Sequence, residues 1–158
     1  VGNINPNSID LTLSPDLLRY DLSRGLDFDR VLDPRAANPT FPVTIPPGGL
    51  ELRPGVLYLA STVERTESHR LVPVLHGKSS VGRLGLCVHV TAGFGDDAWE
   101  GTWTLEMTCV HPVRVYHGMR ICQLVFEELV GERQRYAGRY VNQAGPVASR
   151  FHLGEAGA

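Results

Sequence analysis

The stretch TWTLEMT, residues 102–108, alternates strictly between polar and apolar side chains. Because successive side chains of a β-strand point to opposite faces, this period of two predicts a strand with Trp103, Leu105 and Met107 packed into a core. Glu106 falls on the opposite face, between two threonines. That face either meets solvent, which is the more common arrangement, or lines a wet pocket, where a carboxylate flanked by hydroxyl groups can move a proton.

Short runs rich in Val, Leu, Ile and Thr recur on both sides of this stretch. The 17 glycines and 11 prolines are spread through the chain and separate these runs, which is typical of many short strands. No long stretch has helical periodicity. The expected strands are 9–13, 43–45, 56–63, 71–75, 86–91, 102–108, 113–116 and 120–127. The sequence therefore predicts an all-β sandwich or distorted jelly roll.

Two segments lack this strand pattern. Residues 23–47 are rich in Pro, Asp and Arg, and they predict a long surface excursion or an interface arm. Beyond residue 128 the chain turns polar and Gly-rich. We expect one β domain over residues 1–128, followed by a segment over 129–158 that is either disordered or a lid that orders over a ligand.

Composition and charge exclude several classes of partner. A chain of 158 residues is the usual length of one domain, and its formal net charge of -2 provides no overall positive field for a polyanion. Aromatic residues are not interleaved with a basic stripe, so we expect no nucleic-acid partner. No apolar run approaches the roughly 20 residues of a membrane-spanning helix, and the first residues lack a signal-peptide pattern. The expected protein is soluble and cytoplasmic, with no membrane partner.

The three cysteines, Cys87, Cys109 and Cys122, are widely spaced in apolar stretches and are interpreted as buried free thiols. The chain has no Cys-x-x-Cys, and no His-x-Glu followed by a cysteine pair. Those spacings hold the metal in the zinc nucleobase deaminases. If this protein deaminates a base, we expect it to do so without zinc, and we expect no metal ligands from the protein itself.

A second stretch, HGKSSVGRL at residues 76–84, follows an expected strand. Two hydroxyl groups, a lysine and backbone N–H groups could cradle phosphate oxygens there, with one helical turn over residues 81–84. The first glycine of a P-loop is missing, because Val72 occupies its position. An ordinary turn is the simpler interpretation of this pattern alone.

Several motifs in a fixed order resemble the dCTP deaminase family, which belongs to the superfamily that also contains the trimeric dUTPases. The block GKSSVGRLGL at 77–86, HVTAGFGD at 89–96, WEG at 99–101 and TLE at 104–106 is similar to the family's signature. NPNSIDL at 5–11 resembles its early segment, and GMRICQL at 118–124 resembles a Gly-Met-x-Ile-x-x-Leu strand. RYVNQ at 139–143 with VASR at 147–150 resembles its C-terminal closing segment. The resemblance therefore covers nearly the whole chain.

The resemblance implies a distorted jelly roll or β-barrel of the dUTPase-like type. It further implies a homotrimer with active sites between subunits, and Mg²⁺ carried in by the triphosphate. Glu106 matches the family's general base, which takes a proton from the attacking water and passes it towards N3 and the ammonia leaving C4 of the cytosine. Arg83 and Ser79 match the side chains that hold this water and stabilise developing charge.

The same resemblance assigns substrate contacts. Lys78 and Ser80 match phosphate contacts, the segment Val90, Thr91 and Ala92 matches the reader of the base edge, and Asp96 and Trp99 match residues near the deoxyribose. The closing segment would seal the terminal phosphates. The remaining candidate contacts are Gln123, Tyr136, Arg139, Tyr140 and Gln143.

One departure from the family pattern falls inside the expected site. The residues GDDA at 95–98 stand where the family commonly has Ile-Asp-Pro-Gly, so the turn under the sugar is expected to differ in shape. Asp97 would add a second carboxylate near the triphosphate, and a dication could offset its charge.

Three functions fit these residues. The first is a dCTP deaminase that releases dUTP and ammonia, favoured by TLE at 104–106 and the closing segment. The second is a bifunctional enzyme that gives dUMP and pyrophosphate, favoured by TAGF at 91–94, with Asp96 orienting a second water. A plain dUTPase fits less well, because Trp99 stands where those enzymes usually have Tyr. The third is a nucleotide-binding β module without catalysis, which the joint presence of Glu106, Arg83 and Ser79 argues against. The strict deaminase is the favoured expectation.

Overall fold

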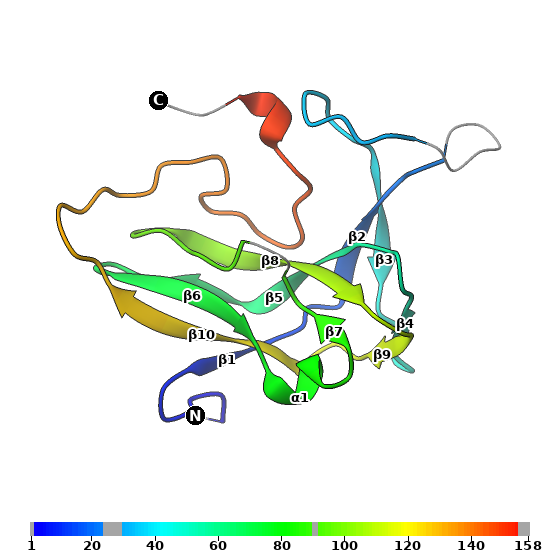
Figure 1. Cartoon of the computed structure of the whole chain (residues 1–158), viewed down its shortest axis with the longest axis horizontal. Helices are drawn as coiled ribbons and strands as arrows, with labels where there is room; N and C mark the ends of the chain where they lie inside the picture. The colour runs from blue at the N-terminus through cyan, green and yellow to red at the C-terminus, as the bar shows by residue number, and fades with distance from the viewer. Residues whose placement is uncertain (1, 24–29, 90–91, 155–158) are drawn as a thin grey trace.

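The computed structural model describes residues 2–23, 30–89 and 92–154, and within these ranges the strands form three antiparallel sheets (Figure 1). One sheet has the order β1-β10-β6 and consists of β1 (Ile9–Thr12), β10 (Arg120–Glu128) and β6 (Leu71–Gly77). The largest has the order β3-β2-β5-β8-β7. Its strands are β3 (Thr40–Thr44), β2 (Asp16–Tyr20), β5 (Tyr58–Glu67), β8 (Glu100–Cys109) and β7 (Leu86–Cys87). A small ribbon pairs β4 (Leu50–Leu52) with β9 (Val113–Val115).

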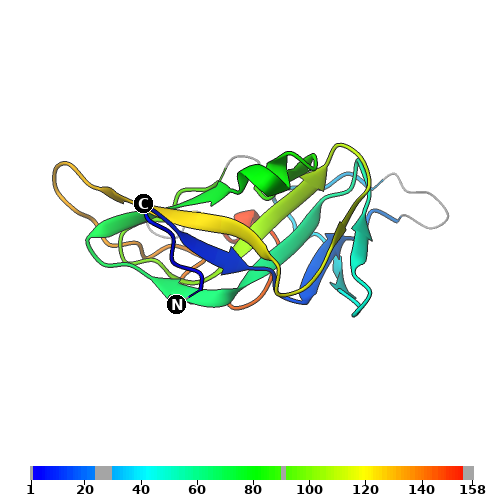
Figure 2. The same ribbon diagram turned by 90° about the horizontal axis from the view of Figure 1, so that it is seen from below.

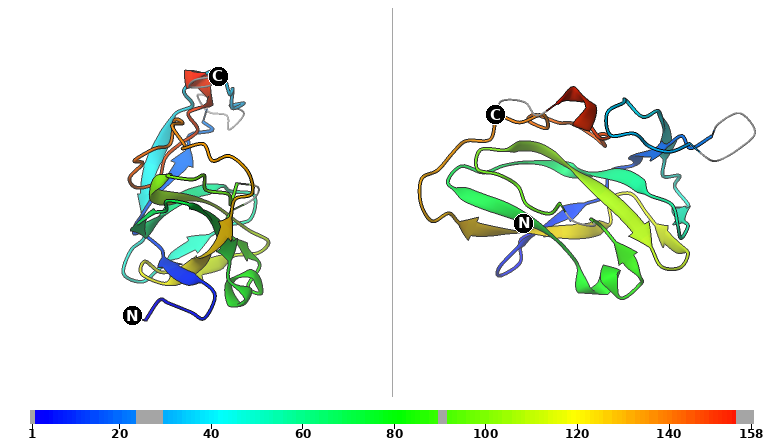
Figure 3. Two further views of the ribbon diagram at one scale, coloured as in Figure 1. Left: turned by 90° about the vertical axis from the view of Figure 1, so that its left-hand side faces the viewer. Right: turned by 45° about the horizontal axis from the view of Figure 1, so that its top comes forward.

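The two larger sheets lie over one another and enclose a common apolar core (Figures 2 and 3). Leu11 and Ile121 come from the first sheet, and Leu17, Leu105 and Met107 come from the second. Each of these side chains is at most 1% exposed. Burial of apolar surface on this scale is the main favourable contribution to folding, so the core fixes how the two sheets face each other.

β8 confirms the alternation expected from its sequence. Trp103, Leu105 and Met107 are buried, whereas Thr104 and Glu106 on the opposite face are half-buried. The strand is longer than expected, because it begins at Glu100, and it pairs with β5 and with the short β7. Its polar face is therefore free to line a site on the outside of the sheet.

Four expectations about elements need correction. β2 and β4 were not expected, and β7 ends at Cys87, before the expected end at residue 91. Cys87 is also exposed, contrary to expectation, whereas Cys109 and Cys122 are buried free thiols as expected. The expected strand 86–91 includes residues 90 and 91, which lie outside the described residues. The segment 23–47 contains β3, which pairs along β2 instead of running only over the surface. β2 is short and has no sustained alternation of polar and apolar side chains. Pairing with β3 on one side and β5 on the other holds it in the sheet.

Helical structure in the described part of the chain is limited to α1 (Ser79–Gly82) and the 3-10 turn η1 (Phe151–Leu153). The expected turn at 81–84 therefore begins earlier, at Ser79, and Arg83 caps its C-terminal end. None of the described helices has the length and apolar character needed to cross a membrane.

The polypeptide after β10 runs back across the outer face of β8 (Figures 1 and 3). We call residues 129–154 the closing segment. Its backbone joins β8 through a parallel bridge between Gly101 and Gln143. The N–H of Asn142 donates to the carbonyl of Glu100 (2.9 Å), and the N–H of Thr102 donates to the carbonyl of Gln143 (3.0 Å). These backbone bonds hold the segment against the large sheet.

Candidate functional site

A cavity of about 460 Å³ lies between the outer face of the large sheet and the closing segment. The sheet contributes residues of β2, β5 and β8, and residues 92–99 form a second wall, here called the site loop. Its lining consists of Tyr20, Leu57, Leu59, Ala92, Phe94, Gly95, Asp96, Trp99, Trp103, Thr104, Glu106, Tyr136, Tyr140, Gln143, Val147 and Ser149. The cavity is therefore rich in aromatic rings but contains two carboxylates.

Glu106 reaches the cavity because of the register of β8. Glu106 pairs with Leu59 of β5, and Thr104 lies two residues earlier on the same face. Both Glu106 and Thr104 line the cavity. Of the two interpretations open from the sequence, the arrangement favours the wet pocket, in which a half-buried carboxylate stands beside a hydroxyl group.

Two neighbouring aspartates of the site loop have opposite surroundings. Asp96 lines the cavity, and partial burial raises the pKa of its carboxyl group. Asp97 is not among the residues that line the cavity, and it is 2% exposed. It accepts the backbone N–H of Arg70 and pairs with the Arg133 guanidinium, and these bonds hold the pKa of Asp97 below its ordinary value. The expectation that Asp97 adds charge next to a triphosphate is therefore wrong for the described chain.

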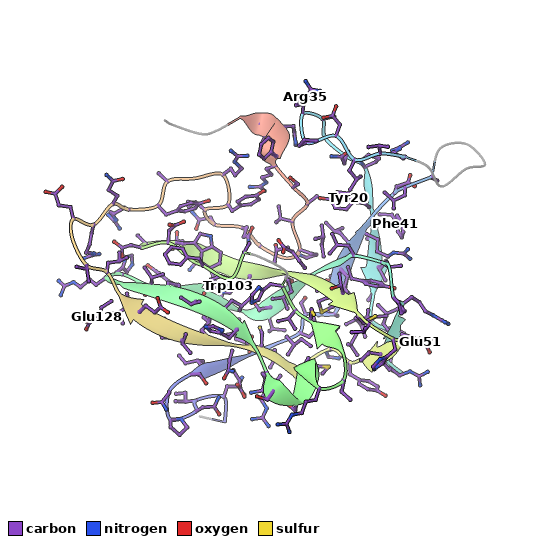
Figure 4. All side chains as sticks on the ribbon, viewed as in Figure 1. Tyr20, Arg35, Phe41, Glu51, Trp103 and Glu128 are labelled. Carbon is purple, nitrogen blue, oxygen red and sulfur yellow. The ribbon has the colours of Figure 1, made fainter. Side chains whose placement is uncertain are left out.

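Two tryptophans form the aromatic wall of the site. The ring centroids of Trp99 and Trp103 are 4.7 Å apart and their planes are tilted by 49°. The Trp99 indole N–H donates to the carbonyl of Tyr140 (3.2 Å), and the Trp103 indole N–H donates to the hydroxyl of Thr66 (2.9 Å). Figure 4 shows Trp103 beneath the backbone of the closing segment. Because both indoles are held by hydrogen bonds, the apolar wall has a fixed orientation.

The closing segment crosses the cavity and is held beyond it as well. The N–H of Val147 donates to the hydroxyl of Thr104 (3.2 Å), and the N–H of Ser149 donates to the hydroxyl of Tyr20 (3.0 Å). Tyr20 projects from β2 towards this segment in Figure 4. The segment therefore contacts two of the strands that border the cavity, β8 and β2.

Arg139 and Arg150 clasp each other within the closing segment. The Arg139 guanidinium donates to the carbonyl of Arg150 (3.1 Å), and the Arg150 guanidinium donates to the carbonyl of Arg139 (2.6 Å). Arg139 also lies over the ring of Phe151, at 5.8 Å from its centroid. In the described parts of the chain neither arginine has a carboxylate partner, so two positive charges are available beside the cavity.

A second group of predicted site residues gathers around α1, outside this cavity. The Lys78 ammonium pairs with Asp10, which is 1% exposed, and Arg120 lies 3.6 Å from the same carboxylate. Burial opposes ionisation of Asp10, but hydrogen bonds from Lys78 and Asn5 outweigh it and the pKa of Asp10 is lowered. We call this group the α1 cluster; its other predicted members are Ser79, Ser80, Arg83 and Gln123.

Hydrogen bonds of Gln123 connect the α1 cluster to neighbouring segments of the chain. Its amide donates to the carbonyl of Gly77 (3.0 Å), and its oxygen accepts the hydroxyl of Ser8 (2.8 Å). Ser79, Ser80 and Arg83 are exposed. In Figures 1 and 3, α1 lies on the opposite side of the molecule from the closing segment. A single chain therefore does not bring Arg83 and Ser79 into the cavity that Glu106 lines.

The predicted site residues thus fall into three groups, apart from Arg139, which lies in the closing segment but does not line the cavity. The cavity unites Ala92, Asp96, Trp99, Glu106, Tyr136, Tyr140 and Gln143, while the α1 cluster holds Lys78, Ser79, Ser80, Arg83 and Gln123. Val90 and Thr91 lie outside the described residues. Sequence reasoning missed Tyr20, Thr104 and Ser149 as lining residues. The alternation of β8 could have indicated Thr104, whereas no local pattern marks the other two.

Carboxylates suited to a hard cation are sparse. No group of three or more His, Cys, Asp or Glu side chains in the described chain could hold a metal ion. Asp96 nevertheless places one carboxylate on the cavity wall. Mg²⁺ commonly binds through one or two carboxylates together with substrate phosphates, so the residues present fit a magnesium ion that arrives with a triphosphate.

Comparison with known proteins agrees with these features. Residues 1–129 match the family described as dCTP deaminase-like. The chain is 47% identical over 145 residues to a protein of Hathewaya histolytica named dCTP deaminase, dUMP-forming, covering 91% of this chain and 80% of the relative. A protein of Cytophaga hutchinsonii with the same name is 49% identical over 145 residues, with the same coverage.

A solved structure supports the fold. The crystal structure of 2′-deoxycytidine 5′-triphosphate deaminase from Agrobacterium tumefaciens has a TM-score of 0.62 and 20% sequence identity to this chain. The match covers 80% of this chain, which spans 40% of the length of that protein. At this identity the likeness concerns the fold alone, and it confirms the expected all-β, dUTPase-like architecture.

Proposed function

This chain belongs to the dCTP deaminase-like family, and on that premise we propose that it hydrolyses dCTP to ammonia, dUMP and pyrophosphate. The observation that carries the proposal is the position of Glu106 on the wall of the cavity, in a chain nearly half identical to proteins named for this reaction. Glu106 is the residue that the family resemblance assigns as general base.

The name of the relatives changes which product we favour. The sequence alone favoured a strict deaminase that releases dUTP, with dUMP formation as the alternative. Relatives at 46 to 49% identity are named dUMP-forming, which supports the alternative. Two hydrolytic reactions would then occur on one bound nucleotide.

In the first reaction, water adds to C4 of the cytosine. Glu106 accepts a proton from this water and delivers it to N3, and a second proton transfer to the amino group lets ammonia leave. The balance is dCTP and water in, dUTP and ammonia out. A positioned general base of this kind contributes roughly 10²- to 10⁴-fold to the rate. The hydroxyl of Thr104 and the wall of Trp99 and Trp103 limit where the cytosine ring can lie.

In the second reaction, water attacks the α-phosphorus of the bound dUTP and the bond to the bridging oxygen breaks. The products are dUMP and pyrophosphate. Asp96 is the candidate to orient this water, because its carboxylate lines the cavity and its pKa is raised by partial burial. Magnesium bound through the triphosphate and Asp96 would neutralise phosphate charge. Gln143, Tyr140 and Arg139 of the closing segment are the candidates for holding the terminal phosphates.

We further propose that a second copy of this chain supplies the α1 cluster, in a homotrimer. The supporting observation is that Arg83 and Ser79 are exposed on α1, away from the cavity that contains Glu106. Preorganised donors must lie close to the reacting atoms to stabilise developing charge. A neighbouring subunit could bring them there, with Lys78 and Ser80 towards the phosphates.

The experiment that tests the proposed reaction is product analysis. The protein is incubated with dCTP and magnesium, and with dUTP in a parallel tube, and the nucleotides are separated by anion exchange. We expect dUMP, pyrophosphate and ammonia in equal amounts from dCTP. Accumulation of dUTP with no dUMP would identify a strict deaminase, and unchanged dCTP would favour a binding module.

A further inference from the structure

Asp97 connects three segments that are distant in sequence. Its carboxylate accepts the backbone N–H of Arg70 (2.8 Å), in the turn between β5 and β6, and pairs with the guanidinium of Arg133 (2.6 Å), in the closing segment. Its backbone carbonyl accepts the N–H of Tyr136 (2.8 Å). The Asp97 side chain is 1% exposed and the Arg133 side chain is 41% exposed, so a buried carboxylate pairs with a guanidinium at the surface.

The backbone around Asp97 is held in a conformation that side chains rarely adopt. Arg70 has a φ of 83° and Ala98 has a φ of 63°, both in the left-handed region. The N–H of Ala98 donates to the carbonyl of Ser68 (2.9 Å), which ties the site loop to the same turn. Such backbone strain persists only where the surrounding contacts determine the structure strongly. The contacts of Asp97 supply part of that determination.

Tyr136 connects Asp97 to the cavity. Its N–H is bound by the Asp97 carbonyl, its ring lines the cavity, and its hydroxyl accepts the N–H of Tyr140 (3.4 Å). The Tyr140 carbonyl in turn accepts the indole N–H of Trp99. Displacement of Arg133 would therefore move aromatic groups that border the nucleotide site.

We propose that Asp97 and Arg133 are positioning residues, which hold the near end of the closing segment over the nucleotide cavity. The inference rests on the proposed function for its effect on substrate, and neither residue lines the cavity itself. The middle of the segment is held separately by the backbone bonds of Gln143 to β8. Loss of the Asp97–Arg133 pair should therefore loosen one end of the segment and leave the fold intact.

The test compares Arg133→Gln with Arg135→Gln. Both variants remove one positive charge from the same exposed stretch, but Arg135 forms no ion pair within the described residues. We expect Arg133→Gln to raise the KM for dCTP about tenfold with kcat within about twofold, as for a loss of binding that is equal in ground and transition states. Arg135→Gln should keep the wild-type KM, and Arg133→Lys should recover part of the loss.

A second readout needs no turnover. Amide hydrogen exchange at Tyr136 in the unliganded protein should be faster in Arg133→Gln and in Asp97→Asn than in wild type, because its partner carbonyl is no longer fixed. Unchanged exchange at Tyr136, or an equal rise in KM in both arginine variants, would overturn the positioning role. If the wild-type protein leaves dCTP unchanged, the proposed function fails while the exchange measurement still decides this inference.

Discussion

Adjacent side chains of the same type serve different purposes in this site. Asp96 and Asp97 are identical in chemistry, but one lines the cavity and the other is buried against Arg70 and Arg133. Burial raises the pKa of Asp96, whereas hydrogen bonds lower the pKa of Asp97. The two carboxyl groups therefore differ in their surroundings and not in their chemistry. The family resemblance assigns Asp96 to the site, but nothing in two successive aspartates indicates that Asp97 is buried against Arg70 and Arg133.

At Glu106, replacement with glutamine keeps the shape of the side chain and removes the base. We expect Glu106→Gln to lower the rate of ammonia release by roughly 10²- to 10⁴-fold. Calorimetric titration should show dCTP binding close to that of wild type, because the triphosphate contacts remain. A variant that retains more than about a tenth of the wild-type rate would contradict the general-base role.

The buried ion pair of Asp10 is expected to stabilise the fold. Its carboxylate is buried against Lys78 and Arg120, and removal of one partner from a buried ion pair costs about 3 to 5 kcal/mol. We expect Asp10→Asn to lower the free energy of unfolding by about 3 kcal/mol in urea at neutral pH and fixed protein concentration. The control is Asp16→Asn, an exposed position on β2 that should change stability by about 0.5 kcal/mol or less. Equal effects of the two variants would contradict the account.

The lowered pKa of Asp10 also makes the free energy of unfolding depend on pH. The pKa of Asp10 is lowered from its ordinary value of 3.8. Its ionised form therefore stabilises the folded protein above that pH, and this contribution is lost as the pH falls through the lowered native pKa. Urea titrations across this acid range should show the stability advantage of wild type over Asp10→Asn shrinking. An advantage that grows on acidification would have the wrong sign.

At the scale of elements, β8 and the closing segment make the site together. The alternation of polar and apolar side chains in β8 could be predicted from the sequence, because one face of the strand is buried and the other is half-buried. The path of the closing segment could not be predicted from the sequence, because its bonds to β8 are made largely by backbone groups, which carry no sequence signal. The side-chain bond from Gln143 to the carbonyl of Thr102 also ends on a backbone group. The family resemblance indicated a closing segment, but only the structure gives its partners. β2 was not predicted for the same reason, because its position depends on backbone pairing with β3 and β5.

Gly101 permits the close approach of these two elements. Its φ is 150°, and an added Cβ would lie 2.8 Å from the carbonyl oxygen and 3.2 Å from the amide nitrogen of Gln143. We expect Gly101→Ala to push residues 142–143 away and to speed hydrogen exchange at the Asn142 amide. Gly145→Ala is the matched control, because Gly145 has a φ of 69° but no atom within 4 Å of an added Cβ. Unchanged exchange at Asn142 in the Gly101 variant would show that this contact does not hold the segment.

At the scale of the whole molecule, the predicted catalytic set is divided within each chain. Glu106 faces the cavity, while Arg83 and Ser79 lie on the exposed α1 on the other side. Motif order in the sequence was enough to indicate all three residues. Spacing along a chain does not report which copy of the chain completes a site, so their distribution between subunits remains a proposal.

Mixing two inactive variants tests this division. Glu106→Gln and Arg83→Ala should each be inactive alone. When the two are refolded together, mixed oligomers would contain some sites with both Glu106 and Arg83 intact, and we expect partial recovery of activity. Size measurements on each variant confirm that assembly itself is unchanged. No recovery from well-assembled mixtures would contradict a site shared between subunits.

The central claim is that the protein carries out both hydrolyses, at C4 of the cytosine and at the α-phosphorus, and heavy-oxygen water tests it most directly. The protein is incubated with dCTP and magnesium in this water, and the nucleotides are analysed by mass spectrometry. The account predicts dUMP that carries one heavy oxygen at C4 of the uracil and another on its phosphate. Labelled dUTP as the final product, or dUMP labelled only at C4, would contradict it.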